Sequence, residues 1–182
     1  MEEKNILQLK VRLLEIKPLI WRRILIEATA GLDDLHRAIQ LSMGWENYHL
    51  YSFTYGGEHF DFDGDDEPSI KLSTLGLQKG DEIFYEYDFG DCWKHKIRVE
   101  KLLDKEAGLF YPRCIDGKRS CPPEDSGGPW GYEDKLEILH DKAHPDYEEV
   151  AEWMGGNFDP ERFDIKKANN RMEGNLMLTR TS

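Results

Sequence analysis

Hydrophobic and polar positions alternate at the start of the chain and predict a strand over residues 6–16. Apolar side chains fall on one face and polar side chains on the other, in the order Leu7, Gln8, Leu9, Lys10, Val11, Arg12 and Leu13. Residues 20–27 are rich in β-branched and aromatic side chains and predict a second strand. Because Lys17-Pro18 marks a turn between the two, we expect an antiparallel hairpin.

A spacing of three and four residues between apolar positions then predicts a helix, through Leu32, Leu35, Ile39 and Met43. Thr29 is its expected N-cap, and Gly44 is expected to end it. Further strands are predicted over residues 49–55, 58–62, 82–88 and 95–102, with turns at Gly56-Gly57 and around Gly90.

The character of the sequence changes beyond residue 103. Residues 111–131 are rich in Cys, Pro and Gly, which favours an irregular but ordered loop. Helices are predicted over residues 129–140 and 146–154, the second with Val150, Trp153 and Met154 facing inward. A last helix is expected to begin at Asp159-Pro160 or at Asp164 and to end near Met172.

This order of elements is typical of a β-grasp domain, a similarity of fold that implies no function. We predict the α+β class, with a β-grasp-like mixed sheet and one N-terminal helix packed on it. An irregular Cys/Pro/Gly loop and a small C-terminal helical section follow. The predicted organisation is a single domain over residues 1–172, made of parts 5–103 and 104–172, with a loosely ordered tail over 173–182.

Composition narrows the class of protein. Lys and Arg number 24 and Asp and Glu 36, a net charge of −12 in 182 residues. This charge, with no basic stripe visible in the sequence, argues against direct binding to nucleic acid or to anionic membranes and favours a basic protein partner. No apolar run is long enough to span a membrane, and the first residues do not resemble a signal peptide. Three cysteines and no export signal predict a cytoplasmic location, whereas the oligomeric state is left open.

Residues 61–100 carry nearly half of the excess negative charge, and much of that part lies in one run, residues 61–67. The spacing of Asp61, Asp63 and Asp65 resembles the start of an EF-hand loop, but Asp66 stands where that loop needs glycine and Leu72 where it needs glutamate. We therefore expect a solvated acidic loop.

The turn around Gly90 gathers Asp88, Asp91 and His95, which are the candidate catalytic residues. A carboxylate bonded to an imidazole can orient it as a general base. The alternative is an ordinary turn, in which the aspartates accept backbone N–H groups and Trp93 packs in the core.

Metal binding is weakly indicated at Cys114, Cys121 and Asp125. The two cysteines lie further apart than the pairs typical of zinc sites, and a full ligand set is missing. The alternative is a pair of buried thiols or a reversible disulfide. We predict no cofactor, with zinc or another divalent metal as the alternative.

Trp93, beside the turn around Gly90, is a candidate binding residue, and the other candidates fall in two places. Trp21 and Arg23 share one strand face and suggest a site that binds an anion. The alternative is that Arg23 forms an internal ion pair. The loop after Cys121 offers a pocket wall made of Glu124, Asp125, Trp130 and Tyr132. The alternative for this loop is a rigid lid over the sheet. His36 and His49 are expected to be packing or capping residues.

Several long segments resemble the plasmid pRiA4b ORF-3-like family, some members of which are labelled passenger proteins of transposable elements. These segments are IKPLIWRRILIE, DLHRAIQLSMGWENYHLYSF, GDEIFYEYDFGDCWKHKI, YPRCIDGKRSCPPEDSGGPWGYED and GGNFDPERFD, collinear over residues 5–172. The resemblance implies a compact α+β domain of archaea, bacteria and their mobile elements, without an established activity. Ser126 stands where family members often have cysteine, which argues further against a metal cluster.

The sequence favours a protein- or peptide-binding adaptor, because no catalytic motif is complete. The alternatives are a small enzyme or a ligand- or metal-binding protein that uses the Asp88-Asp91-His95 turn and the Cys114–Tyr132 loop. A mobile-element accessory protein that acts through a partner is the third alternative. Whether any reaction is catalysed is left open, with the balance against an enzyme.

Overall fold

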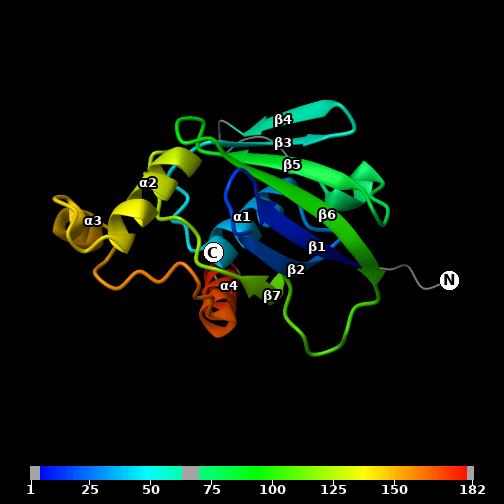
Figure 1. The fold of residues 1–182 in the computed structure, drawn as a ribbon. Coiled ribbons are helices and arrows are strands. Elements are labelled where there is room, and N and C mark those ends of the chain that lie inside the picture. The colour runs from blue at the N-terminus through cyan, green and yellow to red at the C-terminus, as the bar shows by residue number, and fades with distance from the viewer. Residues whose placement is uncertain (1–4, 63–69, 180–182) are drawn as a thin grey trace.

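The computed structural model describes residues 5–62 and 70–179. Seven strands form one sheet in the order β4-β3-β5-β6-β1-β2-β7 (Figure 1). Their bounds are β1 Ile6–Leu13, β2 Trp21–Glu27, β3 Tyr51–Tyr55, β4 Glu58–Phe62, β5 Glu82–Tyr87, β6 Trp93–Leu103 and β7 Arg113–Lys118. The long strands β1 and β6 lie at the centre, so each of them is paired on both edges.

Within the described residues, four α-helices accompany the sheet, namely α1 (Leu32–Met43), α2 (Gly128–His140), α3 (Tyr147–Trp153) and α4 (Ile165–Thr179), with a short 3-10 helix at Leu72–Leu75. Helix α1 packs its apolar side chains into the main core together with one face of the sheet. Helix α4 lies against α1 and β7, whereas α2 and α3 pack together to one side (Figure 1). Helix α4 extends past Met172, where the sequence pattern placed its end.

The α+β class is confirmed, but the sheet differs from the predicted mixed sheet. Every pairing between neighbouring strands in the described part of the chain is antiparallel. Successive pairings therefore give β2, β6 and β3 one direction and β1 and β5 the opposite one. Helix α1 connects β2 to β3, and these two strands run in the same direction. They do not form a parallel pair, because β1, β6 and β5 lie between them in the sheet.

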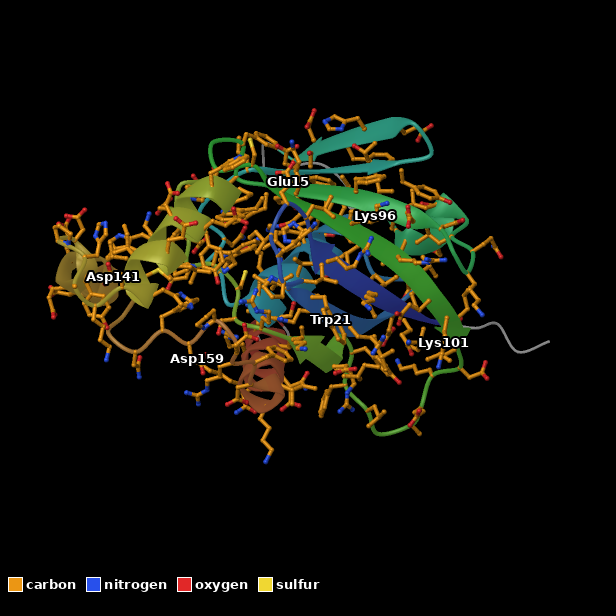
Figure 2. The ribbon with its side chains drawn as sticks, viewed as in Figure 1. Glu15, Trp21, Lys96, Lys101, Asp141 and Asp159 are labelled. Carbon is orange, nitrogen blue, oxygen red and sulfur yellow. The ribbon has the colours of Figure 1, made fainter. Side chains whose placement is uncertain are left out.

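The N-terminal hairpin is confirmed, with Leu9 opposite Ile24. The four alternating apolar residues of β1, namely Leu7, Leu9, Val11 and Leu13, are all buried in the main core. In β2 the alternation places Arg22 on this core face and Trp21 on the opposite one (Figure 2). Residues 58–62 also form the predicted partner strand of β3.

Arg22 is nearly fully buried, and its guanidinium satisfies three carbonyl groups. It donates to Ser42 O (3.0 Å), Trp21 O (2.8 Å) and Lys118 O (3.0 Å). Its other side stacks on the ring of Phe163 at 4.0 Å. These bonds join β2 to the end of α1 and to β7, which explains why a buried cation is tolerated here.

Three local predictions are wrong. Residues 113–118 were expected in an irregular loop, but they form β7, because β2 offers a free edge and backbone groups in a packed domain need partners. Helix α1 is capped at Gly31, whose N–H donates to Asp34 (3.0 Å), and not at Thr29, whose hydroxyl donates to Glu27. Trp153 is 46% exposed.

Two sequence predictions fall partly outside the described residues. Of the acidic run, Asp61 and Phe62 end β4, and the expected acidic loop and EF-hand-like spacing extend into residues 63–69, beyond the described part of the chain. In the tail predicted over residues 173–182, α4 accounts for residues up to Thr179. None of the helices within the described ranges has the length and apolar character needed to cross a membrane.

Candidate functional site

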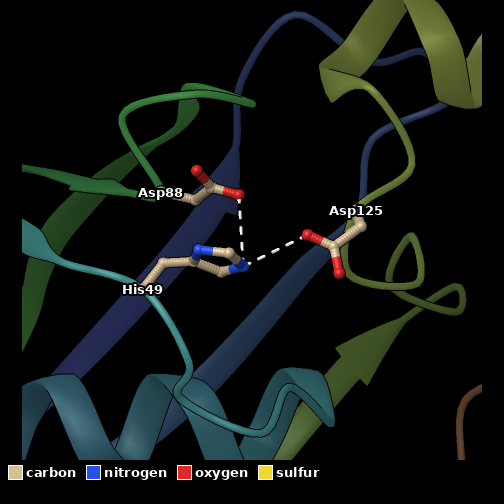
Figure 3. Close-up of side chains that lie close together, drawn as sticks. All are labelled: His49, Asp88 and Asp125. Carbon is tan, nitrogen blue, oxygen red and sulfur yellow. Dashed lines mark ion pairs between the residues drawn. The ribbon is translucent and has the colours of Figure 1, made fainter.

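One histidine and two carboxylates from three separate segments converge at one end of the sheet (Figure 3). His49 belongs to the segment between α1 and β3, Asp88 follows β5, and Asp125 lies in the loop before α2. His49 Nε2 lies 3.2 Å from Asp125 Oδ1 and 3.6 Å from Asp88 Oδ2. One potential ligand atom from each residue lies within 4.8 Å of the others. We call these three residues the His49 cluster.

Asp88 is held rigidly by the turn that it begins. Its backbone has a φ of 58°, in the left-handed region, where aspartate is one of the few tolerated residues. Its Oδ1 accepts the N–H groups of Gly90 (2.9 Å) and Asp91 (3.3 Å). The predicted turn chemistry is therefore present, and it leaves Oδ2 directed at His49.

The loop carrying Asp125 is fastened to the same turn. Asp91 Oδ2 accepts the N–H of Gly127 at 3.0 Å. Gly128 has a φ of 70°, and a Cβ placed there would lie 2.5 Å from the carbonyl oxygen of Asp91. Only glycine permits both the backbone conformation and this close approach.

Glu124 ties the loop to the other two segments. One carboxylate oxygen accepts the hydroxyl of Tyr87, and the other accepts the N–H of Glu46 at 2.8 Å. Burial and this carboxylate raise the pKa of Tyr87. Trp45 adds a bond from its indole N–H to Pro122 O (2.9 Å). Bonds from both neighbouring segments therefore position the Cys/Pro/Gly loop.

The environment of the three side chains differs from one to the next. The Asp88 side chain is 10% exposed, that of His49 32% and that of Asp125 71%. The ring of His49 packs edge-on against Tyr87, with centroids 5.8 Å apart. His49 Nε2 is itself buried and makes no well-aligned hydrogen bond within the described residues. The cluster thus has an inner wall and a side open to solvent.

The predicted catalytic residues are not brought together as a group. Asp88 joins the His49 cluster and Asp91 fastens the loop, but His95 lies in the core with no exposed surface. Its ring contacts Trp45 (5.4 Å between centroids) and Tyr85 (5.1 Å), and burial lowers its pKa to about 3. Trp93 is likewise fully buried, so alternation along β6 places both residues on the core face.

The weak metal candidates are also separated. Cys114 and Cys121 are buried free thiols, and neither belongs to the group of three potential ligands found among the described residues. Burial raises the pKa of both thiols. Asp125, in contrast, is one of the three residues of the His49 cluster.

The remaining candidates are dispersed. Arg23 lies on the sheet face opposite the core and forms ion pairs with Glu100 (2.6 Å) and Asp116 (2.7 Å). This is the internal ion pair that was the alternative to an anion site. Tyr132 is buried with its ring against Phe158, whereas Trp130 is 80% exposed.

His49 was taken for a packing residue, because no spacing in the sequence relates it to Asp88 or Asp125. The sequence feature that could have pointed to His49 as a site residue is the presence of two aromatic residues, Trp45 and Tyr48, close to it. His36, by contrast, is a packing residue, stacked on Tyr51 with centroids 3.5 Å apart.

Fold and site together define an α+β protein with a seven-stranded antiparallel sheet and a His/Asp/Asp cluster at one sheet end. The family described as plasmid pRiA4b ORF-3-like protein matches residues 5–167, and the chain belongs to this family, as its motifs predicted.

Two relatives extend the comparison. The chain is 37% identical over 161 residues to the uncharacterized protein y4hQ of Sinorhizobium fredii, covering 84% of this chain and 82% of that protein. It is similar to the crystal structure of a protein of unknown function, MM3350 from Methanosarcina mazei Go1, with a TM-score of 0.80 and 41% identity. That similarity covers 89% of this chain and 96% of the other.

Proposed function

We propose that the protein binds a divalent metal ion through His49, Asp88 and Asp125. The observation that carries this proposal is the separation of His49 Nε2 from a carboxylate oxygen of each aspartate. Two ligands held ~2.1 Å from a tetrahedral metal lie ~3.4 Å apart. The separations from His49 Nε2, 3.2 Å and 3.6 Å, lie on either side of that value.

The surroundings of the cluster support the same function. His49 Nε2 is buried without a well-aligned hydrogen bond among the described residues, and a metal ion would supply the missing partner. Asp88 is oriented by two backbone N–H groups, the kind of outer contact that fixes metal ligands. The nearby carboxylates of Asp91 and Glu124 add negative potential.

One imidazole and two carboxylates suit zinc, manganese or iron(II) better than a thiolate-selective metal. Three protein ligands with one exposed side leave a position for water or a substrate oxygen. Such an open position is typical of catalytic rather than structural zinc sites. The proposal is therefore a ligand- or metal-binding protein whose ion is accessible from solvent.

Isothermal titration with Zn²⁺, and separately with Mn²⁺, tests this proposal on untagged protein. We expect one ion per chain and a loss of affinity of about a hundredfold in H49A, because one of three ligands is removed. H59A is the matched control, since His59 also pairs with a carboxylate, Asp61 at 2.9 Å, and belongs to no such three-residue group among the described residues. No binding by the wild type, or equal affinity in H49A, would overturn the proposal.

A second candidate is the peptide-binding adaptor, supported by the edge of the sheet at β4. This strand ends the sheet order and exposes the acidic residues Glu58 and Asp61. A basic peptide could add there as a further strand. The test is binding of an alternating lysine-threonine peptide, with E58K/D61K expected to abolish it and the exposed pair E148K/E149K on α3 expected to leave it unchanged. Equal binding by all three proteins contradicts the adaptor role at β4.

A further inference from the structure

The face of the sheet opposite α1 carries a basic groove that the sequence did not reveal. A hollow of about 860 Å³ is lined by six cationic side chains and one acidic side chain. The cations are Lys10, Arg12, Arg23, Lys79, Arg98 and Lys101, and the acid is Glu100. The rest of the chain contains 18 Lys and Arg residues and 35 Asp and Glu residues. The net charge of the groove is therefore positive, whereas the net charge of the rest of the chain is negative. We call it the basic groove.

Strand pairing builds this groove from three segments far apart in sequence. Lys10 of β1 lies directly opposite Arg98 of β6 on one side and Arg23 of β2 on the other. One row further along, Arg12 lies directly opposite Lys96. No basic stripe is visible in the sequence because these cations lie side by side across strands and not along one strand.

Most of these cations lack an ionic partner. Arg23 pairs with Glu100 and Asp116, and the neighbouring Lys96 pairs with Glu82 at 2.9 Å. Within the described residues, no ion pair is formed by the remaining cations of the groove, which are Lys10, Arg12, Lys79, Arg98 and Lys101. Glu82 and Asp116 lie at the two ends of the row that contains Arg98, Lys10 and Arg23. The three cations between them lie directly opposite one another, which destabilises a sheet, so this arrangement suits an external anion that offsets the repulsion.

Aromatic side chains flank the cations on the same face. In one row across the sheet the order is Phe84, Lys96, Arg12 and Trp21. Phe84 is 45% exposed, and Lys96 lies over its ring at 5.3 Å (Figure 2 labels Trp21 and Lys96). Cations interleaved with aromatic rings on an open sheet face are the features that bind single-stranded nucleic acids. An acidic protein segment would use the charge but would gain less from the rings.

We propose that the basic groove binds a single-stranded nucleic acid, with Lys10, Arg12 and Arg98 contacting phosphates and Phe84 stacking on a base. This site is distinct from the His49 cluster and does not depend on metal binding. It also departs from the expectation drawn from the total charge. Total charge describes attraction at long range, whereas binding at contact depends on the local cations, which here lie together.

Fluorescence anisotropy with labelled strands of about 15 nucleotides, oligo-thymidylate and oligo-uridylate, tests the proposal at ~50 mM salt. We expect binding that weakens with salt, and the two strands distinguish DNA from RNA. The variant R12Q/R98Q should bind about tenfold more weakly, with its salt slope reduced by ~1.4 because two phosphate contacts are lost. K142Q/K166Q, which removes two exposed charges elsewhere, should bind as the wild type does. F84A should lose affinity without a change in salt slope.

Several results would overturn the proposal. One is the absence of binding to either strand at protein concentrations up to ~100 μM. A second is an equal loss in K142Q/K166Q, and a third is tighter binding to a duplex of the same length. A labelled polyglutamate peptide that binds as tightly as the strands, with F84A unchanged, would assign the groove to an acidic protein instead. Circular dichroism confirms that each variant is folded.

Discussion

Lys10 of β1 lies directly opposite Arg98 of β6 at the centre of the sheet. Neither side chain forms an ion pair within the described residues, although Glu82 of β5 lies opposite Arg98 on its other side, so the direct interaction between the two cations is repulsive. A double-mutant cycle with K10Q and R98Q should give an unfavourable coupling of ~0.5 kcal/mol in low salt, measured by urea unfolding. The coupling should vanish at ~1 M salt, where charges are screened within a few ångströms.

The matched control for this cycle is the ion pair between Lys96 and Glu82, which joins the neighbouring strands β5 and β6. Its cycle should give a coupling of the opposite, favourable sign. A zero or favourable coupling between Lys10 and Arg98 at low salt would show that their charges do not repel in the folded protein.

Asp91 should act as a positioning residue for the His49 cluster. D91A removes the acceptor of the Gly127 N–H and so frees the loop that carries Asp125. Loss of an outer contact of this kind lowers metal affinity by about tenfold, which titration with Zn²⁺ measures. Hydrogen exchange of residues 124–128 should rise in the same variant. D134A, an exposed change on α2, is the control, and unchanged exchange in D91A would mean that other contacts hold the loop.

Stability should fall as the pH is lowered, because His36 and His95 are buried as neutral groups. Burial lowers the pKa of His36 to about 4 and that of His95 to about 3, whereas in the unfolded chain both are near ~6.5. Between these values the unfolded state binds more protons, so the free energy of unfolding decreases as the pH falls from ~6.5 toward ~3. Each histidine should account for roughly 2 kcal/mol between pH 7 and pH 5.

Urea unfolding of H95F at these two pH values measures the effect. The loss of stability on acidification should be smaller than in the wild type by about 2 kcal/mol. H140Q, at an exposed position, should keep the wild-type loss. If H95F and the wild type lose the same amount, His95 is not the group that opposes folding in acid.

Arg22 should be among the residues on which stability depends most. R22L removes a guanidinium that donates to three carbonyl groups, of which that of Ser42 is buried and those of Trp21 and Lys118 are partly buried, so each loses this donor. We expect a loss of about 3 kcal/mol in the free energy of unfolding, measured with urea. R22K should recover little of it, because an ammonium lacks the planar fork of donors. The exposed change R162L is the control, and a loss in R22L below ~1 kcal/mol would contradict this role.

The alternation of β1 and β2 and the helical spacing of α1 were readable from sequence, because strand and helix periods depend on local geometry. The order of strands across the sheet was not readable in the same way. The segment around Cys114 became a strand only because β2 had a free edge to pair with it. His95 looked like a surface base beside two aspartates, yet its place on the core face of β6 buries it.

The sequence by itself determined most of the secondary elements, the α+β class, the family and the turn built by Asp88 and Gly90. Tertiary structure alone decided which distant side chains meet. It brought His49 to Asp88 and Asp125, and it set Lys10 beside Arg23 and Arg98. Local patterns depend on neighbours within a few residues, whereas a site depends on long-range pairing, which no short pattern encodes.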